Sequence, residues 1–139
     1  MRTAALNHPG GAIGYRLEHE SNALVHALDH EHGDAEADAR LIELARDADL
    51  LVYDAQYLPE EYPGKVGWGH STFEHGARLA AEAGVCSLLL AHHDPLRDDR
   101  AVGRIEAEAR RLFAGSLAAC EGRPHPLDLP AEPSCLKAS

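Results

Sequence analysis

The segment VCSLLLAHHDP, residues 85–95, decides the fold class of this chain. Its first part, 85–91, is a short continuous apolar run, which is typical of a strand buried on both faces of a sheet. The run stops at His92, His93 and Asp94, and the proline that follows cannot donate to a strand ladder. The segment therefore predicts a buried strand that carries polar side chains at its carboxyl end.

Helical patterns alternate with similar apolar runs on the N-terminal side of this segment. Periodic apolar residues indicate helices, and short apolar runs between turn residues indicate strands. Strands are expected at 14–19, 23–27 and 50–53, and helices at 35–47, at 98–119 and from the capping box Ser71-Thr72-Phe73-Glu74 to a stop at Gly84. The resulting order β-β-α-β-α-β-α predicts an α/β layer with a partly parallel sheet.

Length and composition are consistent with one domain. The 139 residues are 45% hydrophobic, enough for a real core. We expect this domain at 1–120, followed by a Pro-rich, poorly ordered tail at 121–139. The formal net charge of -10 argues against broad binding to nucleic-acid backbones, but it does not exclude a local pocket that cuts one phosphodiester.

The sequence shows no signal segment at its N-terminus and no membrane-spanning run. The N-terminus lacks a charged-then-apolar signal pattern, and no apolar run is long enough to cross a bilayer. The three cysteines are widely spaced and form no C-x-x-C zinc motif. We therefore expect a cytoplasmic protein with no membrane partner.

Three expected strands end in a side chain that can bind a metal or move a proton. Asp29, Asp54 and His92 occupy these positions. Each one alone is explained equally well as a turn residue. Ligands of open α/β sheets bind outside the carboxyl ends of the strands, so the three together indicate one shared site.

The histidines add further candidates, each with a plainer alternative. His70 directly precedes the capped helix, and pairing with Asp54 would suit it to general acid work, although it can equally serve only for packing. His8 lies before the first expected strand and is a weak signal alone. In the stretch 29–32, Asp-His-Glu-His, additional metal ligands and a solvated turn are equally consistent with the pattern.

Taken in order, five stretches resemble the metallo-β-lactamase superfamily, in particular its phosphodiesterase branch, which includes tRNA endonuclease Z, cyclic-nucleotide phosphodiesterases and PhnP-type enzymes. The stretches are LNHPGGAIGYRLE, ALVHALDHEH, ADLLVYDAQY, GWGHST and LLLAHHDP. The resemblance implies that the chain is the C-terminal half of the family's αββα sandwich, a mixed sheet with helices on one face.

The same resemblance assigns roles to individual residues. It implies that His8, Asp29 and His92 are metal ligands, that His70 protonates the leaving group and that Asp54 orients His70. It implies two zinc ions per complete site, with manganese or iron as alternatives, and a small-molecule or nucleotide phosphodiester as substrate.

The family's H-x-H-x-D-H motif, which supplies other ligands, does not occur in this sequence. Two expectations follow. The chain is a truncated part of a hydrolase that works as a dimer or with a complementing N-terminal half, or it is an inactive remnant that serves as a binding or assembly module.

Overall fold

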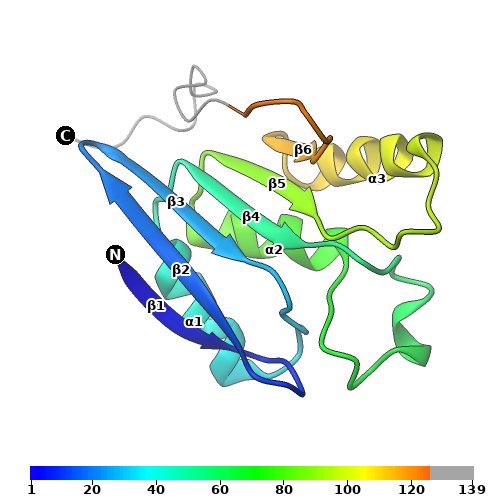
Figure 1. Ribbon diagram of the computed structural model, residues 1–139, viewed down its shortest axis with the longest axis horizontal. Helices are drawn as coiled ribbons and strands as arrows, with labels where there is room; N and C mark the ends of the chain where they lie inside the picture. The colour runs from blue at the N-terminus through cyan, green and yellow to red at the C-terminus, as the bar shows by residue number, and fades with distance from the viewer. Residues whose placement is uncertain (126–139) are drawn as a thin grey trace.

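Six strands pair in chain order, β1-β2-β3-β4-β5-β6, to form a mixed sheet in the computed structural model, which describes residues 1–125 (Figure 1). The first three strands pair antiparallel, and β3 to β6 pair parallel. The strands are β1 (Arg2–Leu6), β2 (Ala12–His19), β3 (Asn22–Ala27), β4 (Leu50–Asp54), β5 (Ser87–Ala91) and β6 (Ser116–Ala118). The helices are α1 (Ala35–Ala45), α2 (Phe73–Ala83) and α3 (Asp99–Leu112), with a 3₁₀ turn at Tyr62–Gly64.

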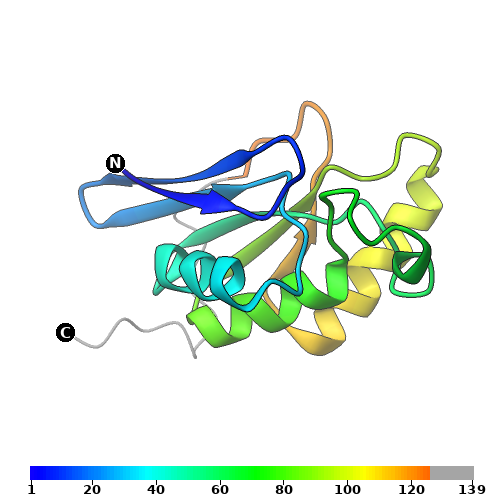
Figure 2. The ribbon, with the colours of Figure 1, turned by 90° about the horizontal axis from the view of Figure 1, so that it is seen from below.

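All three helices lie on one face of the sheet, as Figure 2 shows from below. Between the two layers lies a core of Leu, Ala and Val side chains, with the ring of Tyr53 fully buried among them. The expected α/β layer, with a mixed sheet and helices on one face, is therefore confirmed. Among residues 1–125, no helix combines the length and the apolar character needed to cross a bilayer.

The opposite face of the sheet carries large apolar side chains that remain exposed. Strand β2 alternates, so that Gly14 and Arg16 are buried while Ile13, Tyr15 and Leu17 are 54%, 41% and 49% exposed. A half-buried strand normally places polar residues on its solvent side. This apolar row, Ile13, Tyr15 and Leu17, is called the open face below.

Helix α2 begins one residue later than the capping-box prediction. Thr72 is the N-cap, and its hydroxyl accepts from the backbone N–H of His75 at 3.3 Å. Ser71 is fully buried instead, and its hydroxyl contacts the hydroxyl of Tyr53 at 2.9 Å. The expected stop at Gly84 is confirmed, since this residue has φ of 69° and its N–H bonds back to the last turn.

Two short edge strands differ from the sequence expectation. Strand β1 has no alternating apolar pattern and exists because it pairs with β2. The last helix, expected to reach 119, ends at Leu112, and β6 follows it beside β5. Long-range pairing decides both strands, so local patterns could not reveal them. Of the expected tail, residues 126–139 lie outside the described part of the chain.

Candidate metal centre

The parallel pairing of β3, β4 and β5 brings three polar residues to one edge of the sheet. Asp29 follows β3, Asp54 ends β4 and His92 follows β5, while His70 arrives from the loop before α2. One potential ligand atom from each of these four residues lies within 4.8 Å of the others. The proximity expected from the strand order is therefore present. We call these four residues the strand-end cluster.

Asp54 is the buried centre of this cluster. Its Oδ2 accepts hydrogen bonds from Nδ1 of His70 at 2.9 Å and from Nδ1 of His92 at 3.1 Å. Burial alone would raise the pKa of Asp54, but the hydrogen bonds from His92 and His70 outweigh it and hold the pKa below its usual value. Three backbone N–H groups add to this effect, those of Asp29, Gln56 and Ser71 at 3.1, 3.1 and 3.2 Å.

An ionised Asp54 fixes the tautomers of both histidines. Because the carboxylate accepts at Nδ1 of His70 and His92, each ring keeps Nε2 free to bind a cation or to transfer a proton. The hydrogen bond to Asp54 also raises the pKa of His92 against the opposing effect of burial. Asp29 offers the accessible carboxylate, with its Oδ1 3.7 Å from Nδ1 of each histidine and its side chain 48% exposed.

Backbone strain is concentrated at the same edge. Only four non-glycine residues in the described part of the chain have positive φ, and two of them are Asp29 at 58° and His92 at 59°. An L-residue in this region costs about 1–2 kcal/mol relative to an ordinary conformation. Such strain is typical of functional sites, where the surrounding structure maintains it. Both strands therefore end in a strained turn at the residue that joins the cluster.

His8 lies beside the cluster rather than within it. Its ring is edge-on to that of His70 with centroids 5.6 Å apart, and its Nδ1 accepts from the N–H of Gly10 at 3.1 Å. Gly69 allows this approach, because a Cβ there would meet Cδ2 of His8 at 2.2 Å. The imidazole of His8 is thus placed against the His70 loop with Nε2 free, and its role as a ligand stays a prediction.

The stretch after Asp29 is not a solvated turn, because His30 and Glu31 are buried, and His30 is not an additional ligand. His30 is fully buried, accepts from the N–H of Asn7 at Nδ1 and contacts Asp38 through Nε2 at 2.9 Å. This arrangement leaves no ring nitrogen for a metal. The sequence pattern missed it because Asn7 and Asp38 lie far from each other along the chain.

Glu31 is a positioning residue that sequence reasoning also missed. Its side chain is buried, and its two oxygens accept the backbone N–H groups of Gly67 at 2.6 Å and Gly69 at 2.8 Å. Tyr62 donates its hydroxyl to the same carboxylate. Glu31 thereby holds in place the glycine-rich loop that positions His70. Its partners are more than thirty residues away, so no local signal could have identified it.

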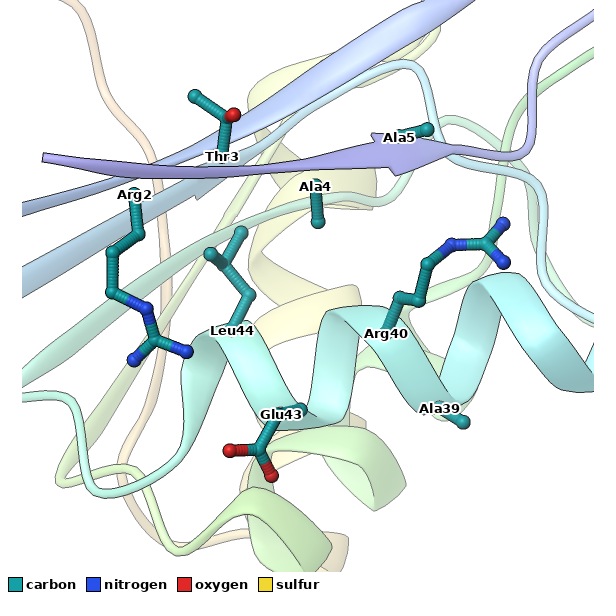
Figure 3. Close-up of a pocket in the computed structure, with 8 residues that line it drawn as sticks. All are labelled: Arg2, Thr3, Ala4, Ala5, Ala39, Arg40, Glu43 and Leu44. Carbon is teal, nitrogen blue, oxygen red and sulfur yellow. The ribbon is translucent and has the colours of Figure 1, made fainter.

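The strand-end cluster opens to solvent and lies apart from the cavities found elsewhere in the described chain. A groove of about 570 Å³ runs between β1 and α1, where Ala4 and Leu44 face each other and Thr3 points away (Figure 3). A second cavity of about 400 Å³ lies between the 58–60 segment and α3. Neither of these two is lined by a member of the cluster.

Comparison with known proteins agrees with this geometry. Residues 2–93 match the family model of the beta-lactamase superfamily domain. Ribonuclease Z of Brevibacillus brevis is 38% identical over 85 residues, 58% of this chain and 27% of that protein. Ribonuclease Z of Ignicoccus hospitalis is 42% identical over 87 residues, 63% of this chain and 28% of that protein.

Two solved structures share the fold. The metallo-beta-lactamase fold protein YhfI from Bacillus subtilis superimposes with a TM-score of 0.69 at 24% identity, over 84% of this chain and 45% of that one. Human tRNase Z, short form, superimposes with a TM-score of 0.55 at 21% identity, over 67% of this chain and 35% of that one.

The matched family model spans well over half of the chain, and the fold and the cluster agree with it. The chain belongs to the beta-lactamase superfamily. It spans little more than a quarter of the length of the ribonuclease Z sequences that it matches.

Proposed function

We propose that this chain carries the late ligands and the proton donor of a metal-dependent phosphodiesterase. The observation that supports this most strongly is the strand-end cluster, in which two carboxylates and two imidazoles meet at the carboxyl ends of parallel strands. The matches to ribonuclease Z favour a phosphodiester over other hydrolysable groups. We propose a small-molecule or nucleotide phosphodiester as the substrate, and a cytoplasmic location stays a prediction.

The side chains at this edge suit a divalent cation. Imidazole and carboxylate are the usual ligands of zinc, and the accessible carboxylate of Asp29 and the free Nε2 of His92 have this chemistry. We propose that these two residues, with His8, hold zinc, manganese and iron being the alternatives. Such an ion acts as a Lewis acid on a phosphoryl oxygen.

His70 is the proposed general acid. In its imidazolium form His70 donates Nδ1–H to Asp54, and the proton on Nε2 passes to the leaving oxygen, which leaves a neutral imidazole. Asp54 keeps its negative charge during this transfer, because the lowered pKa and the three backbone donors stabilise the carboxylate. Glu31 and Gly69 fix the loop from which His70 projects. The acid is therefore oriented before substrate arrives, which lowers the entropic cost of the reaction.

Hydrolysis of bis(p-nitrophenyl) phosphate by the zinc- or manganese-loaded chain tests this proposal. A general acid contributes about 10²–10⁴-fold, so His70→Ala should lower turnover by about this factor. His19→Ala is the matched control, since His19 is exposed at the far end of β2 and should not affect turnover. Absence of turnover, or full activity in His70→Ala, would refute the proposal for this chain.

A second candidate function, an assembly module, is favoured by the open face. Ile13, Tyr15 and Leu17 form an exposed apolar row on a sheet whose other face is covered by helices. Burying such a row against a second copy, or against a complementing N-terminal half, would remove this surface from water. Sedimentation velocity across a concentration series should show a dimer that Leu17→Ser weakens. A monomer at every concentration would exclude self-assembly, and a dimer that binds no metal would favour the assembly role.

A further inference from the structure

The loop that precedes His70 exposes apolar side chains next to the strand-end cluster. Val66 is 63% exposed and Trp68, the one tryptophan of the chain, is 59% exposed. Aromatic residues make up only 5% of the sequence, and the other large rings near the site are buried or partly buried. An indole that adds little to the core but stands beside a catalytic loop is available for a ligand.

The ammonium group of Lys65 lies over this indole. Nζ of Lys65 lies 4.1 Å from the centroid of the Trp68 ring and 5.7 Å from that of Tyr57. Lys65 is the one lysine among residues 1–125, and its charge helps to lower the pKa of Glu61 without a close ion pair between the two among the described residues. Several described arginines differ in this respect, since Arg16, Arg46, Arg78, Arg97 and Arg111 each pair with a glutamate. The charge of Lys65 therefore remains available to an anion.

The loop is held in one arrangement before any ligand binds. Glu31 binds the N–H groups on both sides of Trp68, those of Gly67 and Gly69. At the other end of the loop, Glu61 pairs with Arg97, whose guanidinium also donates to the carbonyl of Gln56 at 3.0 Å. A preorganised surface loses less conformational entropy on binding than a mobile one.

Tyr57 connects this surface to the proposed acid. Its ring centroid is 5.9 Å from that of His70, edge to face, and the same ring lies beneath the ammonium of Lys65. The exposed indole, the free cation and the imidazole thus follow one another along a short stretch of surface. This sequence of groups matches the parts of a nucleotide, an aromatic base followed by a phosphate.

We infer that Trp68 and Lys65 form a nucleotide-binding platform, on which a nucleobase stacks against the indole and the ammonium contacts the adjoining phosphate. This assignment rests on the proposed function, because it identifies the diester substrate as a nucleotide. The indole is 59% exposed with the ammonium of Lys65 beside it, and stacking needs no hydrogen bonds and is tolerant of base identity. The platform places one positive charge beside the strand-end cluster in a chain whose formal net charge is -10.

Binding of adenosine 5′-monophosphate to metal-free protein tests the platform without requiring hydrolysis. The single tryptophan makes intrinsic fluorescence a specific reporter of Trp68. Adenosine 5′-monophosphate should quench this emission saturably, whereas ribose 5-phosphate, which has no base, should not. Lys65→Gln should weaken binding of the monophosphate but not of adenosine. Arg100→Gln, which removes a charge from an exposed position on α3, is the matched control and should leave both unchanged.

Trp68→Ala should weaken binding of the monophosphate by roughly 5- to 150-fold, measured by ligand-observed NMR, which is the range of affinity that base–aromatic stacking spans. Trp68→Phe should retain part of the affinity, and its melting temperature checks that the loop remains folded. Absence of saturable quenching, or unchanged affinity in Trp68→Ala, would overturn the platform. If the protein hydrolyses phosphodiesters but shows no quenching, the platform alone is overturned. If the protein binds the monophosphate but hydrolyses nothing, the platform stands and the proposed function fails.

Discussion

Replacing Asp54 by Asn probes the cluster at its centre with almost no change of shape. The substitution removes the charge that two imidazoles share and places an amide where one carboxylate oxygen accepts three hydrogen bonds. An amide nitrogen cannot accept from the N–H of Asp29 or from Nδ1 of His70 and His92. If the amide nitrogen takes the place of Oδ2, both rings must change tautomer and the N–H of Asp29 loses its partner. If the amide turns instead, the N–H groups of Gln56 and Ser71 lose the oxygen that accepts from them.

The magnitude follows from these contacts. A hydrogen bond to a charged group contributes about 1.5–3 kcal/mol, and an unsatisfied buried N–H costs about 1–3 kcal/mol. Because some bonds reform with the amide, we expect Asp54→Asn to lower the free energy of unfolding by roughly 2–4 kcal/mol. Loss of the carboxylate behind a ligating histidine weakens metal binding by about 10- to 100-fold. The pKa of His92 should also fall, since the hydrogen bond to Asp54 is what raises it.

Three measurements on the same variant separate these effects. Urea unfolding gives the free energy, histidine NMR titration gives the pKa of His92, and calorimetry gives the zinc dissociation constant. Asp49→Asn is the matched control, because Asp49 accepts from the N–H of Ala23 at the opposite end of β4. It should lower stability without changing zinc affinity or the pKa of His92. An unchanged zinc affinity and an unchanged His92 pKa in Asp54→Asn would refute the role given to Asp54.

Two further predictions concern the neighbouring loop and acid stability. Gly69→Ala should displace His8 and weaken zinc binding at least tenfold in calorimetry. Gly67 also has a positive φ, but a Cβ there would meet no atom within 4 Å, so Gly67→Ala should show only backbone strain of about 1–2 kcal/mol. Burial and nearby His75 lower the pKa of His32 to about 4, so its neutral form stabilises the fold fully above pH 6.5 and less as pH falls toward 4. His32→Gln should reduce that loss by about 1–3 kcal/mol in urea titrations, and an unchanged pH dependence would contradict this.

The part of the fold set by local patterns could be predicted from the sequence. The apolar runs that became β4 and β5 and the periodic segments that became α1 and α2 carry their own signals, and the parallel order of the strands then places Asp29, Asp54 and His92 at one edge. Strand β1 could not be predicted, since it depends on pairing with β2.

The candidate site likewise contains residues that local patterns indicate and residues that only tertiary contacts reveal. His70 was identified because it precedes a helix start, and that signal is local. Glu31 and His30 were not identified as positioning residues, because their partners come from the loop before β2, from α1 and from the glycine-rich loop. The position of His8 against Gly69 is likewise a tertiary contact that no spacing along the chain indicates.

Zinc bound to the purified chain, measured by equilibrium dialysis and elemental analysis, shows whether the strand-end cluster is a metal centre. The unaltered chain should retain at least one zinc ion, the double variant Asp29→Ala/His92→Ala should lose it, and His19→Ala should keep it. Retention of the same amount of zinc by the double variant, or no zinc on the unaltered chain, would contradict a metal centre at the strand-end cluster.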